Sequence, residues 1–261
     1  MSYGFNAPDT TIGWIASGGL LLSKLDANDQ PTGGFFNVGQ ASSAVLALTS
    51  DKVEMQDMIY GTLGVAKSKV IKNSGELTLA LSSFSPEVME LCLFGQTTAD
   101  VEQVGATYTA KAYKNRSLVV PGVIAALTSV TVKDAATPLM EGVDYVISNG
   151  SVAITKTSTI TDGVEVTVVY DKAAVKRIEG LVNTGVNVMI VFDGKNMGEE
   201  DLPVKVTYYK VALSPTAQRQ LLTSEWGSQE IKGTLQTSRF VTGTGLSKMF
   251  KEEHVAAAEA L

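Results

Sequence analysis

Few residues of this chain belong to the types that carry out enzyme chemistry. The sequence holds one histidine, His254, and one cysteine, Cys92. His254 lies near the C-terminus in a segment expected to be an exposed helix, so we predict a surface residue. Cys92 lies in a short predicted helix where Val88 and Leu91 share its stripe, which predicts a small buried hydrophobe. Nucleophilic catalysis of the Ser-His or Cys-His kind would therefore lack a partner.

Metal-binding and phosphate-binding spacings are also missing from the sequence. There is no CxxC or HExxH pattern and no phosphate loop of the GxxxxGK[ST] type. Asp26, Asn28 and Asp29 lack the glycine and the distal glutamate of a calcium loop, so we interpret them as turn residues. Glu199-Glu200-Asp201 is expected to be a solvated loop rather than a glycosidase pair. We expect no catalytic residue, metal or cofactor, and this favours a structural or binding role over an enzyme.

Composition narrows the class of partner. The 261 residues are enough for one large or two small domains, and the net charge of −6 argues against a protein that neutralises many phosphates. A lone cysteine gives no disulfide framework, and no apolar run is long enough to span a bilayer. We expect an intracellular origin and no membrane association.

Alternating, β-rich segments between turn residues predict a mainly β fold with short flanking helices. The clearest strand is 75–82, where Leu77, Leu79 and Leu81 share one face that should belong to a core. Ser85-Pro86 and Ser214-Pro215 each follow a strand, and both predict a short helix with a serine N-cap and a proline in its first turn. Helix-forming residues over 246–261 predict a C-terminal helix or tail.

The segment 51–73 reads as a long hairpin. Strand candidates at 53–57 and 66–72 flank a tip, Met58 to Gly64, that is apolar yet broken by glycine. Such a tip is either tucked under the body or an interaction element, and the sequence leaves both open.

Residues 117–171 consist of short β-rich runs separated by turn dipeptides, and this pattern predicts an inserted small all-β module. Asn149-Gly150 and Asp162-Gly163 lie between β-rich runs, and both dipeptides favour tight hairpin turns. The remaining fold would then be discontinuous, over 1–116 and 172–245, followed by the tail.

The order of these segments resembles that of the major tail tube proteins of long-tailed, siphophage-like bacteriophages. The segments that carry the resemblance are Gly33-Gly-Phe-Phe-Asn-Val-Gly39, Asp51-Lys-Val-Glu-Met-Gln-Asp57 at the start of the hairpin, Glu76-Leu-Thr-Leu-Ala-Leu81 before a short helix, Phe192-Asp-Gly-Lys-Asn196, Pro203-Val-Lys-Val-Thr-Tyr-Tyr-Lys-Val-Ala-Leu-Ser-Pro215 and Ser224-Glu-Trp-Gly227. Together they cover roughly 1–116 and 172–245.

The resemblance implies a tail-tube-type β-sandwich or barrel whose copies close into hexameric rings. The rings would stack into a virion tube, made in the host cytoplasm, through which DNA is ejected without specific binding. A tape measure protein and a tail terminator are the further partners implied. The inserted module would stand on the tube exterior.

The resemblance also assigns roles to the hairpin and to one wall. The resemblance implies an acidic lumen, and strand alternation predicts that Glu54, Gln56, Glu76 and Thr78 line it, whereas Lys67, Lys69 and Lys72 could line the channel instead or pair with a neighbour's carboxylates. The hairpin would reach the next ring through tip residues Met58, Ile59, Tyr60, Gly61 and Leu63.

Two alternatives stay open at this point. A terminator or connector of the tail would use a related β fold in a single ring. A β-sandwich carbohydrate-binding or adhesion module would use the insert as its binding domain, although Tyr145 and Tyr170 are the only aromatic residues there.

Overall fold

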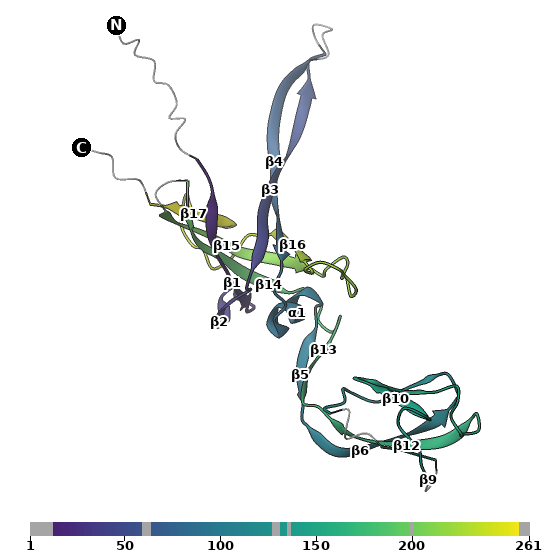
Figure 1. The fold of residues 1–261 in the computed structure, drawn as a ribbon. Coiled ribbons are helices and arrows are strands. Elements are labelled where there is room, and N and C mark those ends of the chain that lie inside the picture. Colours follow the sequence, from purple (N-terminus) through teal and green to yellow (C-terminus); the bar gives the residue numbers. More distant parts are fainter. Residues whose placement is uncertain (1–12, 59–63, 127–130, 135–136, 199–200, 256–261) are drawn as a thin grey trace, which may run out of the picture. The chain divides into compact units, whose positions relative to one another are not determined.

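The computed structural model describes residues 13–58, 64–126, 131–134, 137–198 and 201–255 (Figure 1). Within these residues the chain forms antiparallel β-sheets and one short helix, which confirms the prediction of a mainly β fold. The chain divides into two compact units: unit 1 combines Met1–Gln96 with Glu179–Leu261, and unit 2 is Thr97–Ile178.

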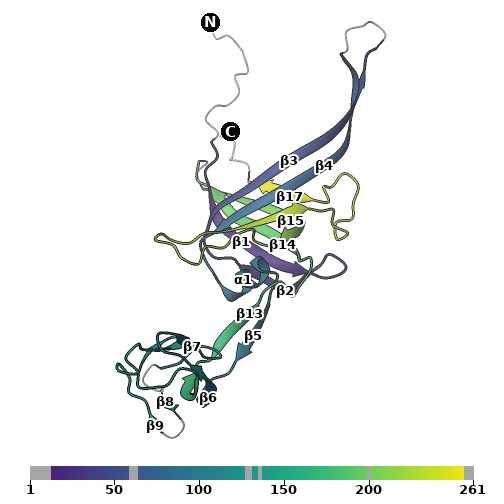
Figure 2. The ribbon, with the colours of Figure 1, turned by 90° about the vertical axis from the view of Figure 1, so that its right-hand side faces the viewer.

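Unit 1 is built on an eight-stranded antiparallel sheet (Figure 2). The strand order is β2-β1-β14-β15-β16-β4-β3, and β17 pairs separately with β15. The strands are β1 (Ala16–Leu25), β2 (Pro31–Asn37), β3 (Ala41–Gln56), β4 (Val65–Leu81), β14 (Asn187–Asn196), β15 (Leu202–Ser214), β16 (Gln229–Leu235) and β17 (Phe250–His254).

The core of unit 1 lies on one face of this sheet. The predicted apolar face of 75–82 is confirmed, since Leu77, Leu79 and Leu81 are buried. They pack with buried side chains of the other strands and of helix α1 (Pro86–Cys92), among them Leu22, Val88, Leu91, Cys92, Ile190, Val211 and Ile231.

The first Ser-Pro corner forms as predicted. Ser85 caps α1, its Oγ accepting a hydrogen bond from the backbone N–H of Val88 at 3.2 Å, and Pro86 is the first helical residue. Proline loses nothing there because the first N–H groups of a helix have no partner within the helix.

The second predicted helix, after Ser214-Pro215, is wrong. β15 continues through Ser214, which pairs with Lys232, and no helix follows in the segment 215–228. A helix of two turns is marginal unless an apolar face is buried, and here the leucines of the segment are exposed. Helix propensity therefore has no packing to support it.

The predicted C-terminal helix is also wrong over the residues the structure describes. Residues 250–254 form β17, which pairs with β15 from Tyr208↔Phe250 to Val204↔His254. This stretch of β15 offers backbone groups to a neighbouring strand, and the gain from pairing overrides the helix propensity of Lys251 to His254. His254 is exposed, as predicted, but on a strand.

Unit 2 consists of two small sheets around a core of its own. One contains β7 (Ser117–Val119), β10 (Tyr145–Ser148) and β11 (Ser151–Ile154); the other contains β6 (Gln103–Ala112), β8 (Thr131–Asp134), β9 (Thr137–Pro138) and β12 (Val164–Lys172). The turn at Asn149-Gly150 joins β10 and β11 as a tight hairpin, as predicted. Buried residues shared by the sheets include Val132, Val152, Ile154, Val166 and Val168.

The inserted unit is wider than the predicted module 117–171. β6, expected in the main body, pairs with β12 along nearly its whole length, so it belongs to unit 2. Where the chain passes between the units, β5 (Gln96–Asp100) pairs with β13 (Val175–Glu179). Local patterning marks each of these strands but not the distant strand with which it pairs.

Candidate assembly surfaces

The one cysteine and the one histidine have very different environments in this fold. Cys92 is fully buried, and burial raises the pKa of its thiol to about 12. His254 stands in the open, with its ring 5.6 Å from that of Trp14 and its Nε2 3.5 Å from a Glu252 oxygen. Among the described residues, no cluster of histidine, cysteine and carboxylate side chains could hold a metal ion.

The acidic turn at 26–29 has a structural role. Asp26 Oδ1 accepts hydrogen bonds from the backbone N–H groups of Asn28 and Gln30, an Asx-type turn. Asp29 has φ +61 and is buried, with Oδ1 2.7 Å from Lys210 Nζ and Oδ2 accepting the Arg239 N–H at 2.8 Å. The hydrogen bond from Lys210, then that from Arg239, holds the pKa of Asp29 below its usual value. This carboxylate ties together three distant segments.

The acidic loop near 200 is described only at Asp201, which pairs with Lys195 at 2.7 Å on the surface. Glu199 and Glu200 lie outside the described residues.

The longest feature of unit 1 is the β3–β4 hairpin. Its ladder runs from Ala41↔Leu81 to Gln56↔Val65, so the strands predicted separately at 66–72 and 75–82 are one strand, β4. Figures 1 and 2 show the distal half standing out from the rest of the sheet. All described residues from Ala47 to Gln56 and from Val65 to Asn73 are exposed.

Large apolar side chains are spread along this exposed hairpin. They are Val45, Leu48, Val53, Met55, Met58, Val65, Val70 and Ile71. A two-stranded hairpin is marginally stable in water by itself, and contiguous exposed apolar surface is typical of interaction sites. The hairpin therefore has the composition of a surface that is covered in an assembly.

The ladder separates the four residues predicted to line one wall. On β3, Glu54 and Gln56 lie an even number of residues after Leu46, so they share its face of the hairpin. Leu46 itself pairs with the core residue Leu77. Glu76 and Thr78 pair with Ala47 and Val45, which belong to the opposite face.

The predicted lysines lie on that second face. Lys67, Lys69 and Lys72 pair with Met55, Val53 and Asp51. β4 has an extra residue where its register shifts between Asp51 and Lys52 of β3. Alternation within each strand cannot reveal this register, and for that reason the sequence did not separate the two faces.

The predicted hairpin tip is only partly described. Met58 is 76% exposed, and Ile59, Tyr60, Gly61 and Leu63 lie outside the described residues.

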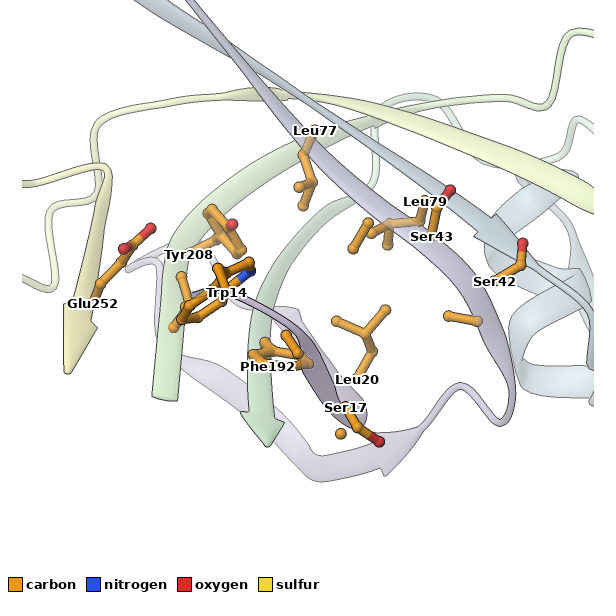
Figure 3. Close-up of a pocket in the computed structure, with 15 residues that line it drawn as sticks. Trp14, Ser17, Leu20, Ser42, Ser43, Leu77, Leu79, Phe192, Tyr208 and Glu252 are labelled. Atoms are coloured by element: carbon orange, nitrogen blue, oxygen red, sulfur yellow. The ribbon is translucent and has the colours of Figure 1, made fainter. Parts of the chain in front are cut away.

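A cavity of about 390 Å³ lies inside the curl of the unit 1 sheet (Figure 3). Its interior is apolar: Leu20, Leu77, Leu79, Phe192 and Tyr208 point into a common space. The lining also includes exposed residues, among them Trp14, Ser17, Ser42, Ser43 and Glu252. The hydrophobic interior and the polar exposed lining are typical of a binding pocket.

The loop joining β15 to β16, residues 215–228, is a surface that sequence reasoning missed. Residues 217–226 are all exposed, including Leu221, Leu222 and Trp226. The sequence predicts a short helix after Ser214-Pro215, whereas the structure has these apolar residues exposed in a loop. The signal available was Trp226 itself, which lies beyond the predicted helix.

No helix among the described residues is long and apolar enough to cross a membrane. Comparison with protein families gives one match: the model described as "Protein of unknown function UCP028589" matches residues 14–252. A search of curated proteins finds no match to the chain.

Proposed function

The chain belongs to this family of proteins of unknown function, and from its geometry we propose that it is a structural subunit of a phage tail tube. Copies close into hexameric rings, and the rings stack into the virion tube through which DNA is ejected. The observation that carries the proposal is the β3–β4 hairpin, which is long, exposed and apolar.

The hairpin supports stacking because its apolar side chains need a partner. Complete burial of a side chain such as Val53 or Met55 is worth about 1.5–3 kcal/mol. Within the described chain these side chains remain exposed, so burial of this kind would have to come from another copy. A surface repeated in every copy gains this energy once per contact, so each ring added to a stack contributes it several times.

The free edge of the sheet also supports self-assembly. β3 is the last strand of the sheet order, so its outer side has no strand partner in the described chain. A sixteen-residue edge of this kind is a hazard for uncontrolled aggregation, and a closed assembly is one way of removing it.

Electron microscopy with two matched variants tests the proposal. The purified protein is expected to form rings and stacked tubes in negative stain, with six-fold symmetry in end views. The variant Val53→Ser/Met55→Ser should keep its fold and lose the tubes. The control variant Val119→Ser/Val146→Ser changes two exposed apolar residues of unit 2 and should still form tubes.

Two results would contradict the proposal. A wild-type protein that stays monomeric at high concentration, with no tubes, would exclude a tube subunit. Single rings that never stack would instead favour the terminator or connector role.

A further inference from the structure

The β15–β16 loop exposes its apolar side chains to a degree rare for a folded protein. The exposed fractions are 78% for Leu221, 95% for Leu222 and 99% for Trp226. Tryptophan is usually largely buried, and aromatic residues dominate the energetics of protein contacts. A cluster of exposed apolar side chains of this kind is typical of a binding element rather than of a solvated turn.

The loop is anchored at its base and has a local turn near its tip. Thr216 donates its backbone N–H to the Cys92 carbonyl at 2.9 Å and its hydroxyl to the Glu230 carbonyl at 2.6 Å. Near the tip, Thr223 Oγ1 accepts the Glu225 N–H at 3.1 Å. Such anchoring reduces the entropy lost when the loop is ordered in a contact.

The cavity lined by Leu20, Leu77 and Phe192 in unit 1 is apolar inside, which is complementary to the apolar side chains of the loop. It combines the apolar interior of Leu20, Leu77 and Phe192 with a volume of about 390 Å³, within the range of pockets that hold a bound group. No residue of the β15–β16 loop lines it, so a copy does not fill its own cavity with this loop. Two other hollows of unit 1 are lined mainly by polar and charged side chains, among them Lys72, Lys248, Glu76 and Lys232.

We propose that the β15–β16 loop of one copy inserts Trp226 and Leu222 into the cavity of the next copy. This inference rests on the proposed tube function and identifies the contact that closes the ring. A protrusion and a complementary pocket on different parts of one surface make a head-to-tail contact, which generates a ring when the rotation closes. The hairpin then acts between rings and the loop within a ring.

Two substitutions, one on each side of the contact, test the inference. Trp226→Ala removes the protrusion, and Ser43→Trp places a bulky side chain at an exposed position in the cavity lining. Both sites are exposed, so each variant should fold; circular dichroism and thermal melting check this. At concentrations where the wild type assembles, each variant alone should be monomeric by light scattering. The concentration at which half of the protein is assembled should be about 30-fold or more above that of the wild type.

Mixing the two variants gives the decisive measurement. The Trp226→Ala copy keeps an intact cavity and the Ser43→Trp copy keeps an intact loop. In the Val53→Ser/Met55→Ser background, which removes the hairpin contact, a 1:1 mixture should therefore form dimers and nothing larger, because each dimer has only one competent loop–cavity contact. Lys114→Trp, at an exposed site in unit 2, is the control and should assemble like the wild type.

The possible outcomes are separable. Rings from either variant alone, or a mixture that stays monomeric, would overturn the loop contact while leaving the tube proposal intact. A wild-type protein that forms neither rings nor tubes would overturn both. Dimers confined to the mixture would support the contact.

Discussion

The buried ion pair between Asp29 and Lys210 predicts a measurable, pH-dependent share of the stability of unit 1. The change to make is Asp29→Asn, because asparagine tolerates the positive φ of this position and keeps an oxygen for the Arg239 N–H. It removes the charge and leaves Lys210 without its partner. The substitution therefore isolates the ion pair from the turn geometry.

The magnitude follows from burial. Breaking a buried ion pair costs about 3–5 kcal/mol. The Asp29 side chain is 6% exposed and that of Lys210 18%, so the lysine can partly reach solvent after the change. We expect a loss of about 2 kcal/mol in the free energy of unfolding at pH 7, roughly a 30-fold change in the equilibrium constant.

Cys92 provides the assay. It is the only cysteine of the chain and is fully buried in unit 1, so its thiol reacts with a dipyridyl disulfide only when unit 1 unfolds. The labelled fraction across a urea series then reports this unit separately from unit 2. The double variant Asp29→Asn/Lys210→Met should recover most of the loss, because neither charge is left unpaired.

The sign of the pH dependence is fixed by the direction of the pKa shift. The pKa of Asp29 is lowered in the folded state, so the ion pair contributes fully above the unfolded value near 4. The contribution is lost as the pH falls through the lower folded pKa. A penalty below about 0.5 kcal/mol at pH 7, or one that persists unchanged in strong acid, would refute the reasoning.

Two further predictions concern one position in each unit. Gly18→Ala should destabilise unit 1 by about 3 kcal/mol, because the added Cβ would lie 2.4 Å from Gly194 Cα, whereas Gly13→Ala meets nothing within 4 Å and should be nearly neutral; equal effects in the Cys92 assay would argue against the close approach of β1 and β14. Asp144→Asn should destabilise unit 2 by about 2 kcal/mol above pH 4, because the carboxylate accepts the N–H groups of Met140 and Thr159, bonds that hold its pKa below the usual value. This penalty should fade as the pH drops through the lowered pKa, and hydrogen exchange of unit 2 peptides measures it; a loss that grows in acid would contradict the assignment.

Several features of the fold could be predicted from the sequence because they depend on neighbours along the chain. The alternation of Leu77, Leu79 and Leu81 reflects the two-residue period of a strand with one buried face. Ser85-Pro86 begins a helix because the cap and the missing N–H act within one turn. Asn149-Gly150 turns a hairpin because these residues accept the dihedral angles of a tight turn.

The candidate surfaces could be predicted only in part. The hairpin and the exposure of Met58 could be predicted, because an apolar segment broken by glycine fits poorly in a core. The cavity could not be predicted, since Leu20, Leu77 and Phe192 come from strands far apart in the chain. Likewise, nothing local separates Glu54 from Glu76, which the ladder assigns to opposite faces of the hairpin.

The sequence by itself determined the β character of the chain, the first strand-to-helix corner and the burial of Cys92. Only the tertiary structure decided that 215–228 is an exposed loop and that 250–254 is a strand. The reason is the same in both places. Local propensity is worth tenths of a kcal/mol per residue, and it is outweighed by the presence or absence of a distant strand or face that can pair with the segment or cover it.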